Sequence, residues 1–330
     1  MNLTCLNTQI YFQNDKLTEM KKIIQSFYHE EEAFIITDKN VYRLYGEKLK
    51  EALSGYKLYF IVLKPGEKAK SIKTYSRIIN KLIEQKITRK HLLIALGGGV
   101  VGDLTGFVAA TILRGISYIQ IPTTLLAQVD SSIGGKTGIN MQKGKNLVGS
   151  FYAPKLVIVD TVFLKTLPEN VYQDGIVEML KIALLKDHDL WMKLKENKQV
   201  NTALVNQAVK AKVSIVEQDE YDQGLRQTLN FGHTFGHAIE KYYKYKISHG
   251  KAIAYGMLLA LELGKSPDKI YQELKEILIQ RKIIAKPFTK ISQVAKLLEY
   301  DKKRMPEGLS FIILLDYQKP KQIWLKDLIE

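Results

Sequence analysis

Cysteine is nearly absent from this sequence, which has a single one, Cys5, among 330 residues. One cysteine excludes a disulfide framework and predicts a reducing, cytoplasmic compartment. Long uncharged apolar runs are missing too, since no stretch approaches the roughly 20 residues that a membrane-spanning helix needs. The opening residues MNLTCLNTQIYFQ have no basic segment followed by an apolar run. We therefore expect neither a secretory signal nor a membrane partner.

Arginine is scarce, although lysine and arginine together outnumber acidic residues 49 to 34 and give a net charge of +15. Such a charge is compatible with a nucleic-acid-binding surface. The lysines are scattered, however, and no nucleic-acid motif accompanies them. Solvated surface lysines explain the charge better, so we expect no nucleic-acid partner. A basic cleft for a phosphorylated small molecule agrees with either interpretation.

The length of 330 residues exceeds one average core and suggests about two domains. The first half alternates β-rich runs with helical patterns, which predicts βαβ units and a mainly parallel sheet. The β-rich runs are 33–38, 57–63, 91–96, 117–122 and 155–160, with helical patterns at 40–53 and 71–86. Later helical patterns cover 168–185, 199–218, 224–243, 249–263 and 268–281, followed by one β-rich run at 310–316. We predict a Rossmann-like α/β domain over 1–160, a mostly helical domain over 161–330, and an active site in the cleft between them.

A glycine-rich turn follows the third β-rich run. Gly97, Gly99 and Gly102 form a G-x-G-x-x-G pattern between a predicted strand and a predicted helix. In this context glycines let the backbone approach a pyrophosphate at a helix N-terminus. The alternative is a tight turn with close helix packing. No acidic residue lies about 20 positions further on to bind a ribose, so a dinucleotide would be held in a variant way.

Lysine is depleted between residues 96 and 140, where only Lys136 and the single arginine Arg114 occur. Lysine is the usual surface residue elsewhere in this chain, so a stretch with so little lysine is expected to be buried or to line a site. Polar residues in or just after this window are Asp130, Lys136, Lys145 and Asn146. Their glycine and serine neighbours expose N–H groups that can bind anions, and lysine adds a charge for phosphate. The alternative is an ordinary long loop.

Two histidines lie four residues apart in LNFGHTFGHAIE, residues 229–240. If 224–240 forms one helix, four of its polar side chains fall within about 60° of arc. They are Arg226, Asn230, His233 and His237. Gly232 and Gly236 add a flank that another backbone can approach closely. The alternative is a solvated polar face, but such a face in this chain would carry lysine, and this segment has none.

A metal site needs more than two imidazoles, because catalytic zinc usually takes three protein ligands. Glu178 and Lys181 lie three residues apart on another predicted helix, an arrangement that suits a ligand beside a general acid or phosphate binder. His249 stands just before a further predicted helix. The residues alone leave open which two of His233, His237 and His249 join Glu178.

Seven segments resemble, in the same order, the motifs of the 3-dehydroquinate synthase family over about residues 34–316. They are GGGVVGDLTGF, RGISYIQIPTTLLAQVDSSIGGKTGIN, GKNLVGSFYAP, FLKTLP, GIVEMLK, LNFGHTFGHAIE and HGKAIAYGM. The resemblance implies an NAD-binding domain, a metal-binding helical domain and a homodimer. It also implies conversion of 3-deoxy-D-arabino-heptulosonate 7-phosphate to 3-dehydroquinate and phosphate in the shikimate pathway, with NAD and one divalent metal, zinc or cobalt.

The resemblance also implies a role for each residue that matches a motif. The implied metal ligands are Glu178, His233 and His249. The implied catalytic residues are His237, Lys181, Asp130, Lys136 and Asp222. The implied substrate-binding residues are Arg114 across the dimer, Asn146, Lys212, Arg226, Asn230 and one of Lys302 and Lys303. The implied NAD-binding residues are Asp38, Asn40, Glu67, Lys70, Gly97, Gly98, Gly99, Gly102, Asp103, Thr123, Thr124, Lys136, Lys145, Phe163 and Thr166.

The implied reaction oxidises an alcohol transiently with NAD, eliminates phosphate, reduces the ketone, opens the ring and closes a carbocycle by an aldol step. One position departs from the family pattern, because Asp222 stands where glutamate is usual. Three rival functions remain: another sugar-phosphate cyclase, a metal-dependent polyol or alcohol dehydrogenase, and a non-catalytic basic binding protein. Arg226 and Asn230 suit a substrate carboxylate that the other cyclases' substrates lack, and a dehydrogenase has no use for so many phosphate-directed cations.

Overall fold

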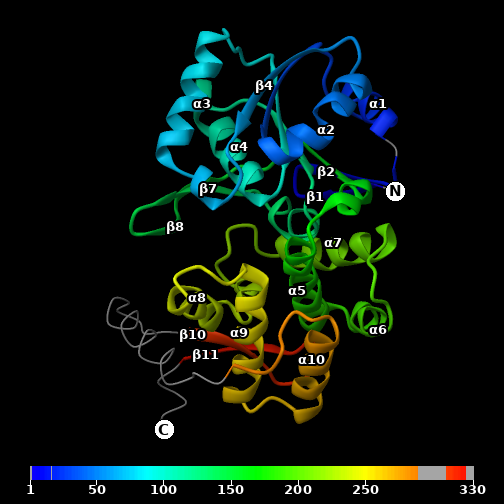
Figure 1. Cartoon of the computed structure of the whole chain (residues 1–330), viewed down its shortest axis with the longest axis vertical. Helices are drawn as coiled ribbons and strands as arrows, with labels where there is room; N and C mark the ends of the chain where they lie inside the picture. The colour runs from blue at the N-terminus through cyan, green and yellow to red at the C-terminus, as the bar shows by residue number, and fades with distance from the viewer. Residues whose placement is uncertain (1, 16, 289–309, 325–330) are drawn as a thin grey trace. The chain divides into compact units, whose positions relative to one another are not determined.

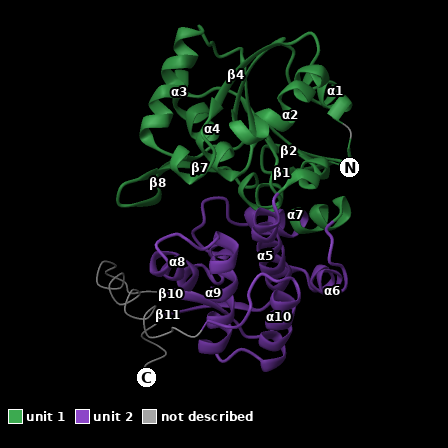
Figure 2. Ribbon diagram, in the orientation of Figure 1, with its two compact units in different colours: residues 1–167, 201–209 green, residues 168–200, 210–330 purple. Residues whose placement is uncertain are grey.

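The computed structural model describes residues 2–15, 17–288 and 310–324, which belong to two compact units. The first unit comprises 1–167 and 201–209, and the second comprises 168–200 and 210–330 (Figure 2). Lys302 and Lys303 lie outside the described residues. Within the described ranges, no helix combines the length and the apolar character needed to cross a membrane.

A seven-stranded sheet forms the centre of the first unit (Figure 1). Its order is β1-β2-β9-β6-β5-β3-β4, and every neighbouring pair is parallel except β1 and β2. The strands are β1 (Asn2–Cys5), β2 (Thr8–Gln13), β3 (Glu32–Asp38), β4 (Lys57–Leu63), β5 (Leu92–Gly97), β6 (Tyr118–Pro122) and β9 (Leu156–Asp160). The predicted parallel sheet is confirmed, and the sequence analysis missed only its first two strands.

Helices cover both faces of this sheet. Along β3, Phe34 and Ile36 enter one hydrophobic core, which includes side chains of α3 and α4. Ala33 and Ile35 enter the opposite core, which includes side chains of α1 and α2. Alternate residues of one strand therefore face two buried layers, as in a doubly wound α/β fold. The helices are α1 (Met20–Gln25), α2 (Lys39–Ala52), α3 (Ile72–Glu84) and α4 (Gly99–Thr111).

The lysine-poor window continues into regular structure after β6. A π-helical turn, η4 (Ala127–Ser131), comes first, and a hairpin of β7 (Lys136–Met141) and β8 (Gly144–Phe151) follows. The alternative of an ordinary long loop is therefore wrong. The unit's short 3-10 turns are η1 (Leu17–Glu19), η2 (Glu67–Ala69), η3 (Ile112–Arg114) and η5 (Thr161–Thr166).

Helices dominate the second unit. Its central helix α5 buries every residue from 175 to 185, so the helix is surrounded by other elements over three turns. The helices are α5 (Glu169–Lys186), α6 (His188–Glu196), α8 (His233–Tyr242), α9 (His249–Leu263) and α10 (Asp268–Gln280), with α7 (Thr202–Val216) divided between the units. A hairpin of β10 (Ser310–Leu314) and β11 (Pro320–Trp324) packs with α8 and α9.

The prediction of one continuous helix over 224–240 is wrong. The chain forms a 3-10 turn, η6 (Leu225–Asn230), and α8 begins only at His233. Between them Gly232 adopts a left-handed conformation with φ +79°. A Cβ on Gly232 would lie 2.8 Å from the Met257 nitrogen of α9. The chain therefore turns at Gly232 where it packs against α9, and the two histidines lie on a different element from Arg226 and Asn230.

The predicted close backbone approach at the two glycines is confirmed. A Cβ on Gly256 of α9 would lie 2.0 Å from the Gly232 oxygen and 2.7 Å from the Gly236 nitrogen. Helices α8 and α9 therefore meet through backbone at three glycines. This contact brings together the two helices that begin at His233 and His249.

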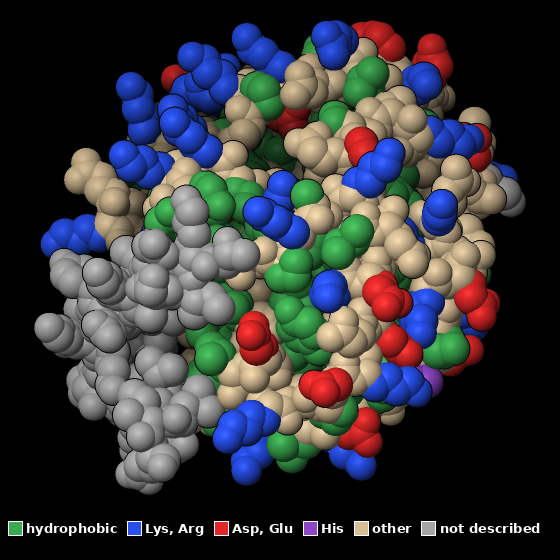
Figure 3. Space-filling model, turned by 60° about the horizontal axis from the view of Figure 1, so that its bottom comes forward, with side chains coloured by type: hydrophobic (Ala, Val, Ile, Leu, Met, Phe, Trp, Pro, Cys, Tyr) green, Lys and Arg blue, Asp and Glu red, His purple; other side chains and the backbone are tan. Residues whose placement is uncertain are grey.

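Basic side chains are scattered on the face shown in Figure 3, and acidic side chains lie among them. This distribution agrees with solvated lysines as the source of the net charge of +15.

Glu273 on α10 joins three elements of the second unit. Its carboxylate accepts hydrogen bonds from Trp191 Nε1 (3.0 Å) and the Tyr317 hydroxyl (2.7 Å), and Lys195 Nζ lies 2.9 Å away. Burial alone would raise the pKa of Glu273, but these donors outweigh burial and lower the pKa to about 2. Because the folded-state pKa is depressed, Glu273 stabilises the fold above the ordinary value of 4.5, and this contribution is lost as the pH falls toward 2.

We expect Glu273→Gln to lower the urea midpoint of unfolding at neutral pH. The difference from the parent protein should shrink steadily below about pH 4.5, because the carboxylate is then protonated in the unfolded state while it stays charged in the folded state down to about pH 2. Urea unfolding curves across this pH range measure the effect. Glu262→Gln, which removes an exposed carboxylate of α9, serves as the control. A deficit that does not change with pH would contradict the assignment.

Candidate functional site

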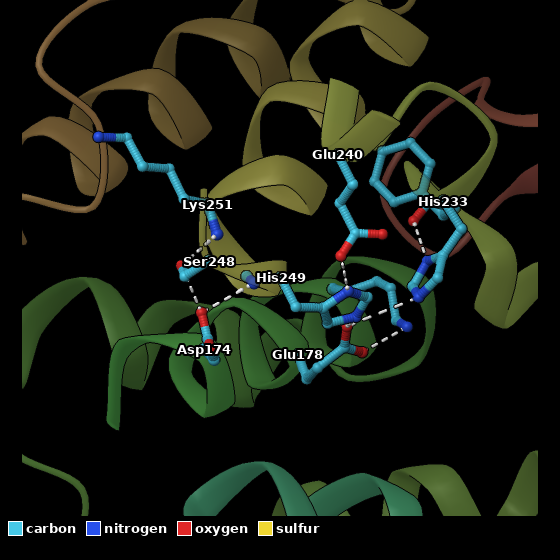
Figure 4. A network of polar contacts seen from close by, with 10 residues as sticks. Asp174, Glu178, His233, Glu240, Ser248, His249 and Lys251 are labelled. Carbon is cyan, nitrogen blue, oxygen red and sulfur yellow. Dashed lines mark hydrogen bonds and ion pairs between the residues drawn. The ribbon is translucent and has the colours of Figure 1, made fainter. Parts of the chain in front are cut away.

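Glu178, His233 and His249 come together in the second unit (Figure 4). Glu178 Oε1 lies 3.8 Å from His233 Nε2 and 4.0 Å from His249 Nε2. One ligand atom from each residue lies within 4.8 Å of the others, so a single ion can reach all three. Two imidazoles and a carboxylate are a donor set of catalytic zinc sites, which leave one position open.

Local structure explains where the two histidines stand. His233 is the first residue of α8 because the chain turns at Gly232. His249 is the first residue of α9, where the Ser248 hydroxyl caps the helix by accepting a hydrogen bond from the Lys251 nitrogen at 3.3 Å. Both rings therefore project from the first residues of their helices.

The Glu178 carboxylate is almost entirely buried. Its side chain is 2% exposed, and Oε2 forms an ion pair with the ammonium of Lys181, whose side chain is 4% exposed. Apart from the Lys181 ammonium at Oε2, the described residues give neither carboxylate oxygen a hydrogen-bond donor. Buried carboxylates normally have hydrogen-bond donors. A bound cation would satisfy these oxygens, so the residues present fit a divalent metal.

The electrostatics of the two histidines differ. Burial lowers the pKa of His233 well below its usual value, and the Lys181 ammonium lowers it further. His233 is therefore neutral at pH 7, the form of imidazole that binds metals. Burial alone would lower the pKa of His249, but the nearby Glu240 and Glu178 carboxylates outweigh burial and raise it.

His237 lies beside this cluster. Its side chain is exposed, and its ring centroid is 5.4 Å from that of His233 and 6.3 Å from that of His249. Among the described residues, the only group of metal-ligating side chains close enough together to hold one ion contains Glu178, His233 and His249. The alternatives that the sequence left open are thereby narrowed to His233 and His249 as the partners of Glu178.

The second unit also buries cationic side chains. Lys181, Lys212 and Arg226 are all at most 6% exposed, and Arg226 Nη1 donates a hydrogen bond to the Glu220 carbonyl. Of the other predicted residues, Asp222 adopts a left-handed φ of +61° before η6, and Asn230 is exposed at its end.

In the first unit, the predicted NAD residues stand at or after the carboxyl ends of five parallel strands. They follow β3 (Asp38, Asn40), β4 (Glu67, Lys70), β5 (Gly97, Gly98, Gly99, Gly102, Asp103), β6 (Thr123, Thr124) and β9 (Phe163, Thr166). In the sheet, β4 lies on one side of β3, and β5 lies on the other side. Open α/β sheets bind ligands at such a switch point. The fold thus gathers residues that are far apart in sequence along one edge.

The glycine turn packs tightly against its neighbours. A Cβ on Gly98 would lie 2.9 Å from Thr124 Cγ2, and one on Gly99 would lie 2.9 Å from Ser131 Oγ. The alternative of close packing is therefore confirmed. Close packing is compatible with nucleotide binding at the same turn, because α4 begins at Gly99 and a helix N-terminus favours a pyrophosphate.

A polar network ties the β7–β8 hairpin to this edge. Lys70 Nζ donates to Asp103 Oδ2 and to Asn146 Oδ1, both at 2.5 Å. Asn140 Nδ2 donates to Glu67 Oε1 at 2.6 Å, and Asn140 Oδ1 accepts from the Asn146 nitrogen at 2.9 Å. Burial raises the pKa of Asp103 despite the adjacent lysine. The sequence analysis missed Asn140, although it closes one of the quoted motifs.

The other predicted residues of the first unit are more dispersed. Asp130 lies on η4, close enough to Asp103 to contribute to its raised pKa. Lys136 and Lys145 are exposed on β7 and β8. Arg114 is exposed at the end of η3, with a left-handed φ of +65°.

Two predicted NAD residues already have hydrogen-bond partners within the unit. Asp38 caps α2 by accepting from the nitrogens of Asn40 and Val41, at 2.8 and 3.1 Å. The Thr166 hydroxyl lies 2.6 Å from the Tyr45 hydroxyl.

Comparison with protein families decides the family of this chain. The model described as 3-dehydroquinate synthase N-terminal matches residues 60–174, and the model described as 3-dehydroquinate synthase C-terminal matches 175–304. The chain belongs to the 3-dehydroquinate synthase family. It is thus an enzyme of this family rather than a non-catalytic basic binding protein.

Curated members of the 3-dehydroquinate synthase family resemble the chain over most of its length. The 3-dehydroquinate synthase of Clostridium acetobutylicum is 42% identical over 324 residues, which cover 93% of this chain and 90% of the relative. That of Clostridium perfringens is 51% identical over 221 residues, which cover 65% of this chain and 63% of the relative.

Solved structures with the same fold include two synthases with bound NAD+ and a metal ion. A 2-deoxy-scyllo-inosose synthase complexed with carbaglucose-6-phosphate, NAD+ and Co2+ superposes with a TM-score of 0.87 at 24% identity, covering 100% of this chain and 98% of that one. A 2-epi-5-epi-valiolone synthase from Streptomyces hygroscopicus with NAD+ and Zn2+ has a TM-score of 0.84 at 24% identity, covering 98% and 93%. At this identity they show the shared fold. A glycerol dehydrogenase from Schizosaccharomyces pombe follows at a TM-score of 0.65.

Proposed function

We propose that the protein is a 3-dehydroquinate synthase, which converts 3-deoxy-D-arabino-heptulosonate 7-phosphate to 3-dehydroquinate and phosphate in the shikimate pathway. The observation that carries the proposal is the buried Glu178 carboxylate, which meets two imidazoles on one side and the Lys181 ammonium on the other. This arrangement supplies a metal site beside a cation for phosphate. Family relatives with this activity in their name align over about nine-tenths of the chain and support the choice of substrate.

We propose that Glu178, His233 and His249 hold one divalent metal, zinc or cobalt. The structural neighbours that carry Co2+ or Zn2+ support this choice of ion. When bound, a divalent cation polarises a hydroxyl or carbonyl oxygen that it contacts. The three residues contribute a neutral imidazole, a second imidazole and a carboxylate, which together leave one coordination position for substrate.

The first unit is proposed to bind NAD along the edge where β3, β4, β5, β6 and β9 end. When bound, this cofactor supplies a reversible hydride acceptor. The glycine turn and the start of α4 would receive the pyrophosphate. Lys70 and Asp103 stand next to that turn and hold the β7–β8 hairpin through Asn146.

The cations of the second unit are proposed to bind the anionic groups of the substrate. Lys181 would bind an anionic oxygen of the substrate next to the metal ligands, and Arg226 offers a planar pair of donors for the substrate carboxylate. Lys212 and Asn230 complete the predicted set. His237 is exposed beside the cluster and would bind the substrate and transfer a proton. Asp130, Lys136 and Asn146 of the first unit stay predicted substrate residues.

We further propose that the enzyme is a cytoplasmic homodimer in which Arg114 of one copy reaches the substrate phosphate of the other. The exposure of the Arg114 side chain supports such a contact.

The test is phosphate release by the purified protein with NAD and Co2+ or Zn2+. We expect equal amounts of phosphate and 3-dehydroquinate from the heptulosonate phosphate. Glucose 6-phosphate, a phosphorylated sugar, should give no product, because it lacks the carboxylate that Arg226 is proposed to bind. No release from the heptulosonate phosphate at saturating metal and NAD would rule out the proposed activity. Faster turnover of glucose 6-phosphate would favour the rival cyclase.

A further inference from the structure

Two carboxylates outside the proposed ligand set lie against His249 (Figure 4). Glu240 contacts its ring, and Asp174 contacts the residues on either side of it, the Ser248 hydroxyl and the Gly250 backbone nitrogen. The sequence analysis assigned no role to either residue. Each belongs to a helix that also carries one of the other two proposed ligands.

Glu240 lies seven residues after His233 on α8, which is two helical turns, so the two side chains share a face. Its side chain is only 6% exposed. Glu240 Oε1 lies 3.4 Å from His249 Nδ1. An acceptor at this distance favours the tautomer with the proton on Nδ1. Nε2, which lies 4.0 Å from Glu178 Oε1, is then the nitrogen available to a metal.

Asp174 lies four residues before Glu178 on α5, one helical turn away. Its Oδ1 accepts hydrogen bonds from the Ser248 hydroxyl at 2.7 Å and from the Gly250 nitrogen at 2.8 Å. These residues flank His249, so Asp174 holds the chain on both sides of it, through the Ser248 hydroxyl and the Gly250 backbone nitrogen. Gly250 permits this contact, because a Cβ there would lie 2.5 Å from the Asp174 Cα.

We propose that Glu240 is a positioning residue for the metal site, which fixes the ring of His249 while Asp174 fixes its backbone. The inference rests on the proposed metal centre. A carboxylate that accepts from the second nitrogen of a ligand imidazole orients the ring and makes the ligating nitrogen more basic. The contact also serves Glu240 itself, because a buried carboxylate needs a partner, and the His249 ring provides one. With α5 and α8 each holding α9, the site is pre-organised before metal binds.

The experiment measures Co2+ binding without substrate or NAD. Glu240→Ala and Asp174→Ala are expected to weaken Co2+ binding about 10- to 100-fold, the usual effect of removing an outer-sphere partner of a ligand histidine. Glu240→Ala should also change the visible absorption spectrum of bound Co2+. Glu240→Gln keeps an acceptor oxygen without the charge, so its loss should be smaller. The control variant Glu262→Gln, which removes an exposed carboxylate on the same helix as His249, should bind Co2+ like the parent protein.

Parent-like affinity and spectrum in Glu240→Gln and Glu240→Ala would overturn the inference, even if both variants unfold at a lower temperature. If Glu240→Ala fails to fold, Glu240→Gln decides: weaker binding supports the inference and unchanged binding overturns it. The readout is independent of turnover. If the parent protein binds Co2+ but forms no dehydroquinate, the proposed function is wrong and this inference still holds. A parent that binds no Co2+ would overturn it.

Discussion

His233→Ala is expected to abolish metal binding, whereas His237→Ala should retain the metal and lose most of the activity. His233 Nε2 lies 3.8 Å from Glu178 Oε1, and its removal leaves two ligands where catalytic sites use three. His237 is one turn further along α8, exposed and outside the ligand cluster. Loss of a residue that transfers a proton typically lowers kcat about 10²- to 10⁴-fold.

Metal content after dialysis and the rate of phosphate release separate the two roles. His233→Ala should lose both metal and activity, and His237→Ala should lose activity alone. His29→Ala, an exposed histidine of the first unit, controls for histidine loss and should match the parent protein in both measurements. Equal metal loss in His233→Ala and His237→Ala would refute this division of labour.

Lys181→Met should destabilise the metal-free protein and tighten metal binding at the same time. The Lys181 and Glu178 side chains are 4% and 2% exposed, so removing the ammonium leaves a buried carboxylate without its cation. Breaking such a pair typically costs about 3–5 kcal/mol. A dication would restore the missing positive charge and would no longer be repelled by the ammonium. Activity should nevertheless fall, because Lys181 is proposed to bind the substrate.

Thermal unfolding with and without Zn2+ measures both effects. The increase in Tm on adding Zn2+ should be larger in Lys181→Met than in the parent. Lys193→Met is a matched control, because Lys193 pairs with Asp189 on the surface of α6, where the side chains are 46% and 66% exposed. An exposed pair of this kind contributes at most about 1 kcal/mol. Weaker Zn2+ binding by Lys181→Met, or a loss of stability no larger than in Lys193→Met, would contradict the prediction.

Local patterns in the sequence predicted the elements closely. Five of the parallel strands appear where β-rich runs alternate with helical patterns, and α9 spans the predicted 249–263. The failure over 224–240 has a specific cause. Its polar residues recur at helical spacing, but this spacing does not report the left-handed conformation of Gly232, which only glycine can occupy so close to Met257 and Ile253 of α9.

The sequence by itself determined the alternating α/β architecture of the first unit, the helices of the second and the residue types of the metal site. Periodicity and composition are local, and they report how one element buries its own face. Tertiary structure decided which histidines meet Glu178 and brought Glu240 and Asp174 to either side of His249. The α5, α8 and α9 residues that meet here come from positions far apart in the chain, and only the packing of the helices, through Gly232, Gly236 and Gly256, sets their distances.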